Sequence, residues 1–169
     1  MYNKRGVIGF AIILCICVVI GSSALTLAQS AEQTYDVDVF LSVKMSPVFR
    51  SKEITIVGAE AMGMMRSNHE SKVFDNCTVH SLVTIATEGK DKTVNGYIKY
   101  IDSDGDCVIF RSQRNPGEKT ATMTILTGTG KWKGITGGGK IVPVAWGKPV
   151  VEGAYLGCNN HKGTFKLPK

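Results

Sequence analysis

Hydrophobic and polar residues alternate along most of the chain after residue 33. From Tyr35 to Val43 the odd-numbered positions are apolar and most even-numbered ones are polar, and Cys77–Ala86 and Thr120–Leu126 follow the same period. A period of two is typical of β-strands that bury one face. Further strand candidates are Glu53–Val57, Val94–Asp102, Cys107–Ser112, Lys140–Trp146, Val150–Leu156 and Gly163–Leu167.

Turn-forming residues separate most of these segments. Gly, Pro, Asn and Asp tolerate positive φ or preset a bend, so their clusters mark the ends of strands. The spacing of roughly 8 to 15 residues leaves no room for crossover helices and favours an antiparallel sandwich or barrel. The meander order favours a barrel, so we predict an all-β fold, an antiparallel eight-stranded barrel. The turn candidates are 88–91, 103–106, 115–118, 147–149 and 159–161.

Two stretches do not follow a regular strand pattern. Pro143 cannot donate a ladder hydrogen bond, so it predicts a bulge or an edge position in the segment 140–146. Gly58–Glu70 contains three methionines and is compatible with a short helix, an irregular strand or a mobile flap. Methionine clusters usually fill a core, although their flexible side chains also line adaptable pockets.

The amino-terminal segment predicts export. Lys4 and Arg5 precede the apolar run Val7–Ile20, and small and polar residues lead to Ala28. This is the layout of a secretory signal peptide. The run is shorter than the roughly 20 residues of a spanning helix. We predict a signal peptide over residues 1–28 and one domain over residues 29–169. After processing, this domain would have no membrane span and would lie in the periplasm or outside the cell. The alternative is that the segment is not cleaved and serves as a membrane anchor.

The charge distribution adds little to the prediction of an exported β-barrel. Residues 29–169 carry 18 basic and 14 acidic side chains, and residues 120–169 carry seven lysines against the single acid Glu152. This basic third either faces an anionic partner or consists of solvated strand faces, and the second interpretation is favoured. We expect no nucleic-acid partner, because basic and aromatic residues do not interleave as they do in single-strand binders.

A glycine-rich segment carries the one family resemblance. Leu126–Gly139 resembles the GGTGKYxGITGSG signature of secreted eight-stranded barrels related to allene oxide cyclase and the dirigent proteins. Gly96-Tyr97 followed by 102–106 is similar to a hairpin of uncharacterised bacterial members. The resemblance implies a calycin-like barrel with an internal cavity, usually without known function and occasionally an isomerase or cyclase. The sequence departs from it at Ile98 and Gly138, and no catalytic residue is carried over.

The same glycines also have a purely structural explanation. They let the chain leave one strand, pack against the end of the barrel as a plug, and enter the next strand. Gly134–Lys140 also fits a phosphate-binding loop, but Ile141 stands at the Ser/Thr position and a strand follows where a helix is needed. The predicted structural loop comprises Gly128, Gly130, Trp132, Gly134, Gly137, Gly138 and Gly139.

Few residues suggest chemistry, and no cofactor is expected. Asp102, Asp104 and Asp106 could hold calcium, but the ligand set is incomplete and a turn capped by its own aspartates explains them equally well. No pair of histidines has the spacing of a zinc site. If the lumen is polar, its candidate residues are His80, Tyr97 and Lys99, although solvent is favoured for the first of them.

The exported domain contains three cysteines, an odd number for an oxidising compartment. Cys77 and Cys107 each begin a strand candidate, and another candidate lies between these two. Two strand spacings exceed the reach of a disulfide. All three pairings stay open, and a bond between Cys107 and Cys158 is favoured.

The sequence alone supports three functions. We expect that the exported barrel binds a small apolar or amphipathic ligand, or an extracellular partner. One alternative is an isomerase or cyclase that works in the lumen, and another is a structural or host-interaction protein that uses its basic surface. A lumen lined by ionisable groups would favour catalysis, and a dry aliphatic lumen would favour binding. Neither the reaction, if any, nor the oligomeric state follows from the sequence.

Overall fold

The computed structural model describes residues 31–149 and 151–169. The predicted signal peptide lies outside these residues, so its cleavage stays a prediction. No helix in the described part of the chain is long and apolar enough to cross a bilayer. The elements are β1 (Gln33–Arg50), β2 (Ile54–Ser67), β3 (Thr78–Glu88), β4 (Asp91–Ile101), β5 (Cys107–Arg114), β6 (Ala121–Gly128), the 3-10 turn η1 (Gly130–Trp132), β7 (Thr136–Trp146) and β8 (Ala154–Lys166).

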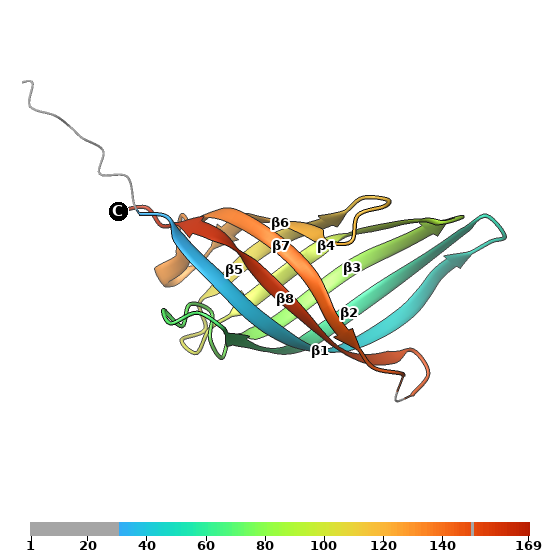
Figure 1. Ribbon diagram of the computed structural model, residues 1–169, viewed down its shortest axis with the longest axis horizontal. Coiled ribbons are helices and arrows are strands. Elements are labelled where there is room, and N and C mark those ends of the chain that lie inside the picture. The colour runs from blue at the N-terminus through green and yellow to red at the C-terminus, as the bar shows by residue number, and fades with distance from the viewer. Residues whose placement is uncertain (1–30, 150) are drawn as a thin grey trace, which may run out of the picture.

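The eight strands form one closed antiparallel barrel. Each strand pairs with its neighbours in sequence, and β8 closes the cylinder by pairing with β1 (Figure 1). Closure leaves no free sheet edge along the paired length of the strands. The sequence prediction of an all-β, antiparallel eight-stranded barrel is therefore confirmed. A register shift between Pro143 and Ala145 gives β7 the irregularity that the proline predicts.

One ambiguous stretch is resolved, and one predicted turn is wrong. Of the three possibilities for Gly58–Glu70, the strand is correct as far as Ser67, where β2 ends. The predicted turn 159–161 lies inside β8, where Asn160 donates through Nδ2 to Asp36 at 2.6 Å and to Asp38 at 3.1 Å. These bonds to β1 supply the partners that a turn would otherwise give to the Asn160 side chain, so local turn preference is overridden.

The side chains that point inward fill one half of the barrel. Alternate residues of β1, from Tyr35 through Val37 and Val39, are almost fully buried. Their outward neighbours, such as Phe40, remain exposed. The inward set continues around the barrel with Met65, Val79, Ile98, Tyr100, Val108, Phe110, Met123 and Phe165.

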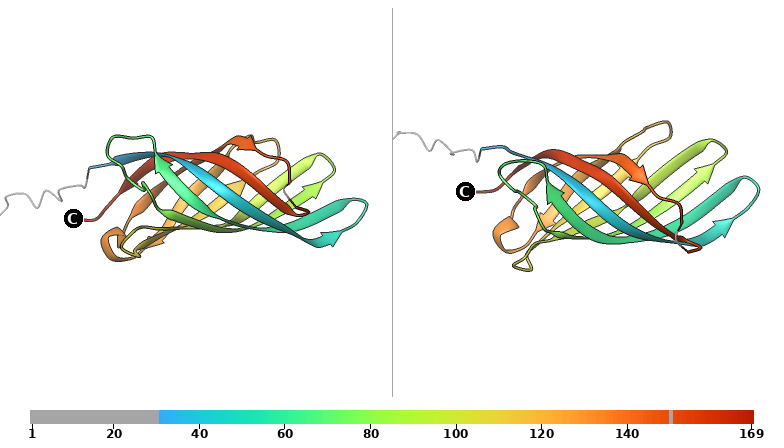
Figure 2. Two further views of the ribbon diagram at one scale, coloured as in Figure 1. Left: turned by 90° about the horizontal axis from the view of Figure 1, so that it is seen from below. Right: turned by 60° about the horizontal axis from the view of Figure 1, so that its bottom comes forward.

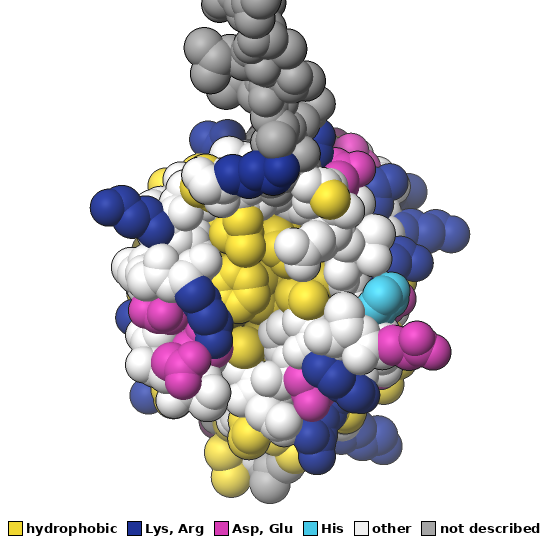
Figure 3. All heavy atoms as spheres, turned by 90° about the vertical axis from the view of Figure 1, so that its left-hand side faces the viewer, with side chains coloured by type: hydrophobic (Ala, Val, Ile, Leu, Met, Phe, Trp, Pro, Cys, Tyr) yellow, Lys and Arg dark blue, Asp and Glu magenta, His cyan; other side chains and the backbone are white. Residues whose placement is uncertain are grey.

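Phe74 seals one end of the barrel. It belongs to the loop between β2 and β3, and its ring packs on Trp132 at 4.9 Å, Tyr100 at 5.3 Å, Tyr35 at 5.4 Å and Phe165 at 5.8 Å between ring centroids. The loop and η1 come together at the end where the described chain begins and ends (Figure 2). Hydrophobic atoms fill the centre of this end, within a rim of backbone and polar side chains (Figure 3).

The loop accepts unfavourable backbone geometry to insert Phe74. Lys72, Phe74 and Asn76 have φ values of 53°, 57° and 56°, in the left-handed region that side chains other than glycine rarely adopt. Backbone hydrogen bonds between Met65 and Cys77 and between Asn76 and Met65 hold the end of the loop on β2. Burial of a phenylalanine among five aromatic rings offsets strain of about 1 to 3 kcal/mol per residue.

Removing the plug residue should destabilise the fold strongly. We expect Phe74→Ala to lower the free energy of unfolding by about 3 to 5 kcal/mol, because it leaves a cavity among the aromatic rings. Phe40→Ala, on the exposed outer wall, should cost less than about 1 kcal/mol. Denaturant unfolding of both variants measures the difference, and equal losses would show that Phe74 does not seal a packed end.

Candidate ligand-binding site

The other half of the lumen is hollow. A cavity of about 340 Å³ opens at the end opposite the plug, near the turns between β3 and β4 and between β5 and β6. Its volume lies at the lower end of the range found for small-molecule sites. Most of its wall is aliphatic and is formed by Leu41, Val43, Val79, Val83, Val94, Ile98 and Ile141.

A polar group lies on the wall of this otherwise apolar cavity. His161 of β8 is 2% exposed and lines the cavity. Its Nδ1 lies 2.6 Å from Oη of Tyr100, whose hydroxyl is also 3.9 Å from the sulfur of Met123. An imidazole nitrogen accepts a hydrogen bond much better than a thioether sulfur does. We assign the Tyr100 hydroxyl as the donor to Nδ1, which places the proton of the neutral ring on Nε2.

Two polar atoms of β8 are left unsatisfied next to the cavity. Nε2 of His161 and Oδ1 of Asn159 are buried, and neither has a hydrogen-bond partner within the described chain. The two residues are separated by one position and share a face of the strand, roughly 6.5 Å apart along it. Buried polar groups are nearly always paired in folded proteins. Both residues line the cavity, so an N–H donor and a carbonyl acceptor without partners lie beside it.

The charge state of this pair is set by burial. Desolvation lowers the pKa of His161 to about 3, so the ring is neutral at physiological pH. Desolvation also raises the pKa of Tyr100 well above its ordinary value. The Tyr100–His161 pair therefore offers neutral hydrogen bonds to a ligand and no formal charge.

The structure corrects the lumen candidates of the sequence. His80, Tyr97 and Lys99 lie on the outer wall, because Val79 and Ile98 take the inward positions of the same strands. His80 is 2.9 Å from the carboxylate of Glu60.

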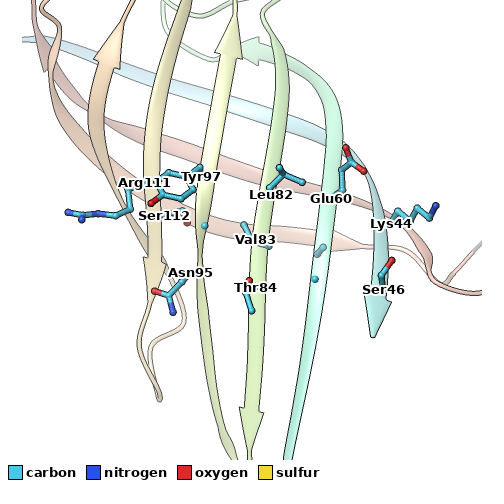
Figure 4. A pocket seen from close by; sticks show the side chains of 13 residues that line it. Lys44, Ser46, Glu60, Leu82, Val83, Thr84, Asn95, Tyr97, Arg111 and Ser112 are labelled. Atoms are coloured by element: carbon cyan, nitrogen blue, oxygen red, sulfur yellow. The ribbon is translucent and has the colours of Figure 1, made fainter. Parts of the chain in front are cut away.

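The outer wall carries a separate hollow of about 530 Å³. Leu82 and Tyr97 are directly opposite each other on β3 and β4, and Arg111 follows on β5 (Figure 4). This hollow is more open than the lumen and is lined by Glu60 and Lys44 as well. None of the buried polar atoms that lack a partner belongs to the residues lining it. The lumen is therefore the stronger candidate site.

The aspartate cluster holds the plug in place. Oδ1 of Asp102 accepts the backbone N–H groups of Asp104 and Asp106, and its Oδ2 accepts Nε1 of Trp132 at 2.8 Å. Lys131 lies 2.9 Å from Asp102 and 2.7 Å from Asp104. Burial opposes ionisation of Asp102, but these donors outweigh it and hold its pKa below the ordinary value. The three carboxylates thus bind the chain's own donors, as the turn interpretation expects.

The glycine-rich segment completes this closure. η1 carries Trp132 onto Phe74, and Ile135 behind it is 3% exposed. Gly130 has a φ of 49°, and a Cβ there would collide with the carboxylate of Asp106. Glycine is thus required where the segment meets the aspartate turn.

The favoured disulfide is not formed. Cys77, Cys107 and Cys158 carry free thiols in the structure. Cys107 lies at the closed end, where β5 begins, and Cys158 lies on β8, so that β6 and β7 separate the two strands. Three strand spacings of roughly 14 Å exceed the span of a disulfide.

His161 and Asn159 were missed because both fall in the predicted turn 159–161. A usable signal is nevertheless present in the sequence. Asn159, His161, Gly163 and Phe165 continue a period of two backward from the strand candidate Gly163–Leu167. That period places the four residues on one face, which is the inward face in the structure.

Comparisons with known proteins identify the fold. No family model matches the chain, and no curated protein matches it. The fold is similar to those of two pterocarpan synthase dirigent proteins. GePTS1 aligns at a TM-score of 0.52 and 13% identity, over 86% of this chain and 97% of that chain. PsPTS1 aligns at 0.53 and 12%, over 83% and 99%. The chain therefore has the barrel fold of dirigent proteins, and at this identity the likeness extends to the fold alone.

The buried histidine should make stability depend on pH. Because burial holds its pKa at about 3, below the reference value of 6.5, the unfolded chain binds the extra proton between these values. Stability should thus fall as pH decreases through this range, by about 2 kcal/mol from pH 6.5 to 4.5. In urea unfolding, the His161→Gln variant should lack the loss of stability that protonation of His161 causes at low pH. His80→Gln, on the outer wall, should keep it, and identical pH profiles of all three proteins would contradict the assignment.

Proposed function

We propose that the protein binds a small, largely apolar molecule in the barrel lumen, with a polar group of that molecule against His161 and Asn159. The observation that carries the proposal is the pair of unpartnered polar atoms on the wall of a mostly aliphatic cavity. A ligand hydroxyl, amide or carboxylic acid group offers both an acceptor and a donor. Such a group would satisfy Nε2 and Oδ1, and its apolar remainder would fill the cavity.

Catalysis is supported less well than binding. The hydrogen-bonded Tyr100 and His161 would be the proton-transfer groups of an isomerase or cyclase that works in this lumen. A general base works best when its pKa lies near the operating pH. The pKa of His161 is about 3, so the ring would be a weak base at neutral pH.

The lysines of the basic surface do not all remain unpaired. Lys131 is engaged by Asp102 and Asp104, and Lys140 and Lys162 are directly opposite each other on β7 and β8. Like charges directly opposite each other are destabilising.

A filled lumen should abolish binding. We expect wild-type protein to bind octanol, and Ala61→Phe to bind it at least tenfold more weakly, because this β2 side chain points into the cavity. Met62→Phe is the matched control, since the next residue along β2 points outward and is 58% exposed. Calorimetric titration measures all three. Thermal unfolding checks that the enlarged residue costs no more than the 1 to 3 kcal/mol typical of overpacking. Equal affinity of the two variants would overturn the proposal.

The proposed setting is outside the cytoplasm. The segment 1–28 has the layout of a signal peptide, and the GGTGKYxGITGSG-like segment resembles secreted barrels related to allene oxide cyclase and the dirigent proteins. The barrel fold shared with dirigent proteins supports that family assignment as far as the fold.

Processing can be tested on the protein from its native host. Mass spectrometry of the intact chain should give an amino terminus at Gln29, after a cut behind Ala28. An intact amino terminus beginning at Met1 would show that the segment is retained.

A further inference from the structure

Three basic side chains line one sector of the cavity mouth. Arg114 ends β5 and is opposite Val94 of β4. Lys92 lies two residues before Val94, and Lys119 lies two residues before Ala121, which begins β6. All three line the cavity. Lys92 and Arg114 come from adjacent strands, and Lys119 lies in the connection between β5 and β6.

The positive charges of these three side chains are not neutralised within the described part of the chain. No acidic residue lines the described cavity. Glu118 is adjacent to Lys119 in sequence, but its carboxylate accepts hydrogen bonds from the backbone and side chain of Asn115. The ion pairs found in the described residues do not include Arg114, Lys92 or Lys119.

Of these three side chains, Arg114 is the one with a buried polar atom that lacks a partner. Its Nε is buried and has no hydrogen-bond partner within the described chain. Lys131 provides a contrast within the same barrel, because two carboxylates lie within 3 Å of its ammonium group. Arg114 as a whole is half-buried, and a charge-assisted hydrogen bond to a ligand would remove the cost of its unpaired N–H.

We infer that the lumen ligand is an organic anion whose charged group lies at the mouth, against Arg114, Lys92 and Lys119. This inference rests on the proposed function and names the class of its ligand. Carboxylate, sulfate and phosphate groups share the required chemistry, since each accepts paired hydrogen bonds from a guanidinium. The apolar body of the ligand extends inward from the mouth, and a neutral polar group at its inner end meets His161 and Asn159.

Three probes with the same apolar body test the charge. Octyl sulfate, octanol and octylammonium each carry an eight-carbon chain, and each is titrated into the full-length exported domain by calorimetry. We expect octyl sulfate to bind about tenfold more tightly than octanol, and octylammonium more weakly than either. The preference for octyl sulfate should shrink as salt screens the charges. Ala61→Phe should abolish binding of all three, which locates them in the lumen.

Variants of residues at the cavity mouth show which side chains cause the preference for octyl sulfate. Arg114→Gln should reduce the affinity for octyl sulfate about tenfold and change that for octanol less than twofold. Arg114→Lys should retain most of the preference, and Lys99→Gln on the outer wall should leave all affinities unchanged. Equal affinities of octyl sulfate and octanol, unaffected by Arg114→Gln, would overturn the anion assignment and leave the proposed function intact. Failure of all three probes to bind would overturn the proposed function itself.

Discussion

The packing of Phe74 into the end of the barrel is the contact on which the rest of the structure depends. Without this residue, the aromatic side chains inside this end of the barrel would lose the ring that covers them. With it, the inward rings of Tyr35, Tyr100 and Phe165 form a dry partition. Aromatic burial of this kind is the largest favourable contribution that a single side chain makes to a small core. The partition gives the lumen a closed end and leaves a cavity above it.

The partition also determines the chemistry of the cavity. Tyr100 belongs to the aromatic cluster and at the same time holds His161 through its hydroxyl. The histidine is therefore fixed in one orientation, in surroundings dry enough to keep it neutral. Preorganised neutral donors and acceptors favour selective binding, because an apolar molecule without a matching polar group would leave them unsatisfied.

Much of the fold is predictable from the sequence because alternation and turn chemistry are local. The period of Tyr35–Val43 identifies β1, and Pro143 identifies the bulge in β7. The error at 159–161 arises because Asn160 bonds to Asp36 and Asp38, more than 120 residues away in sequence. The local period of two places these residues on a strand, but it does not reveal the partners that override the turn preference. Phe74 escapes prediction for a related reason, since its role depends on five rings from other parts of the chain.

The candidate site is less predictable than the fold. Strand parity decides whether a side chain faces the lumen, but only closure of the barrel defines which parity is inward. Parity alone therefore does not exclude His80, Tyr97 and Lys99 from the lumen, and the predicted turn hides the inward position of His161. The unsatisfied atoms of Asn159 and Arg114 are properties of packing and leave no trace in residue type.

A crystal structure of the protein purified from its own host, without extraction by organic solvent, tests ligand binding in the lumen most directly. We expect electron density for one small molecule in the lumen, hydrogen-bonded to Nε2 of His161 and extending toward Arg114. A lumen filled by the protein's own side chains, with those two residues paired to protein groups, would contradict this expectation.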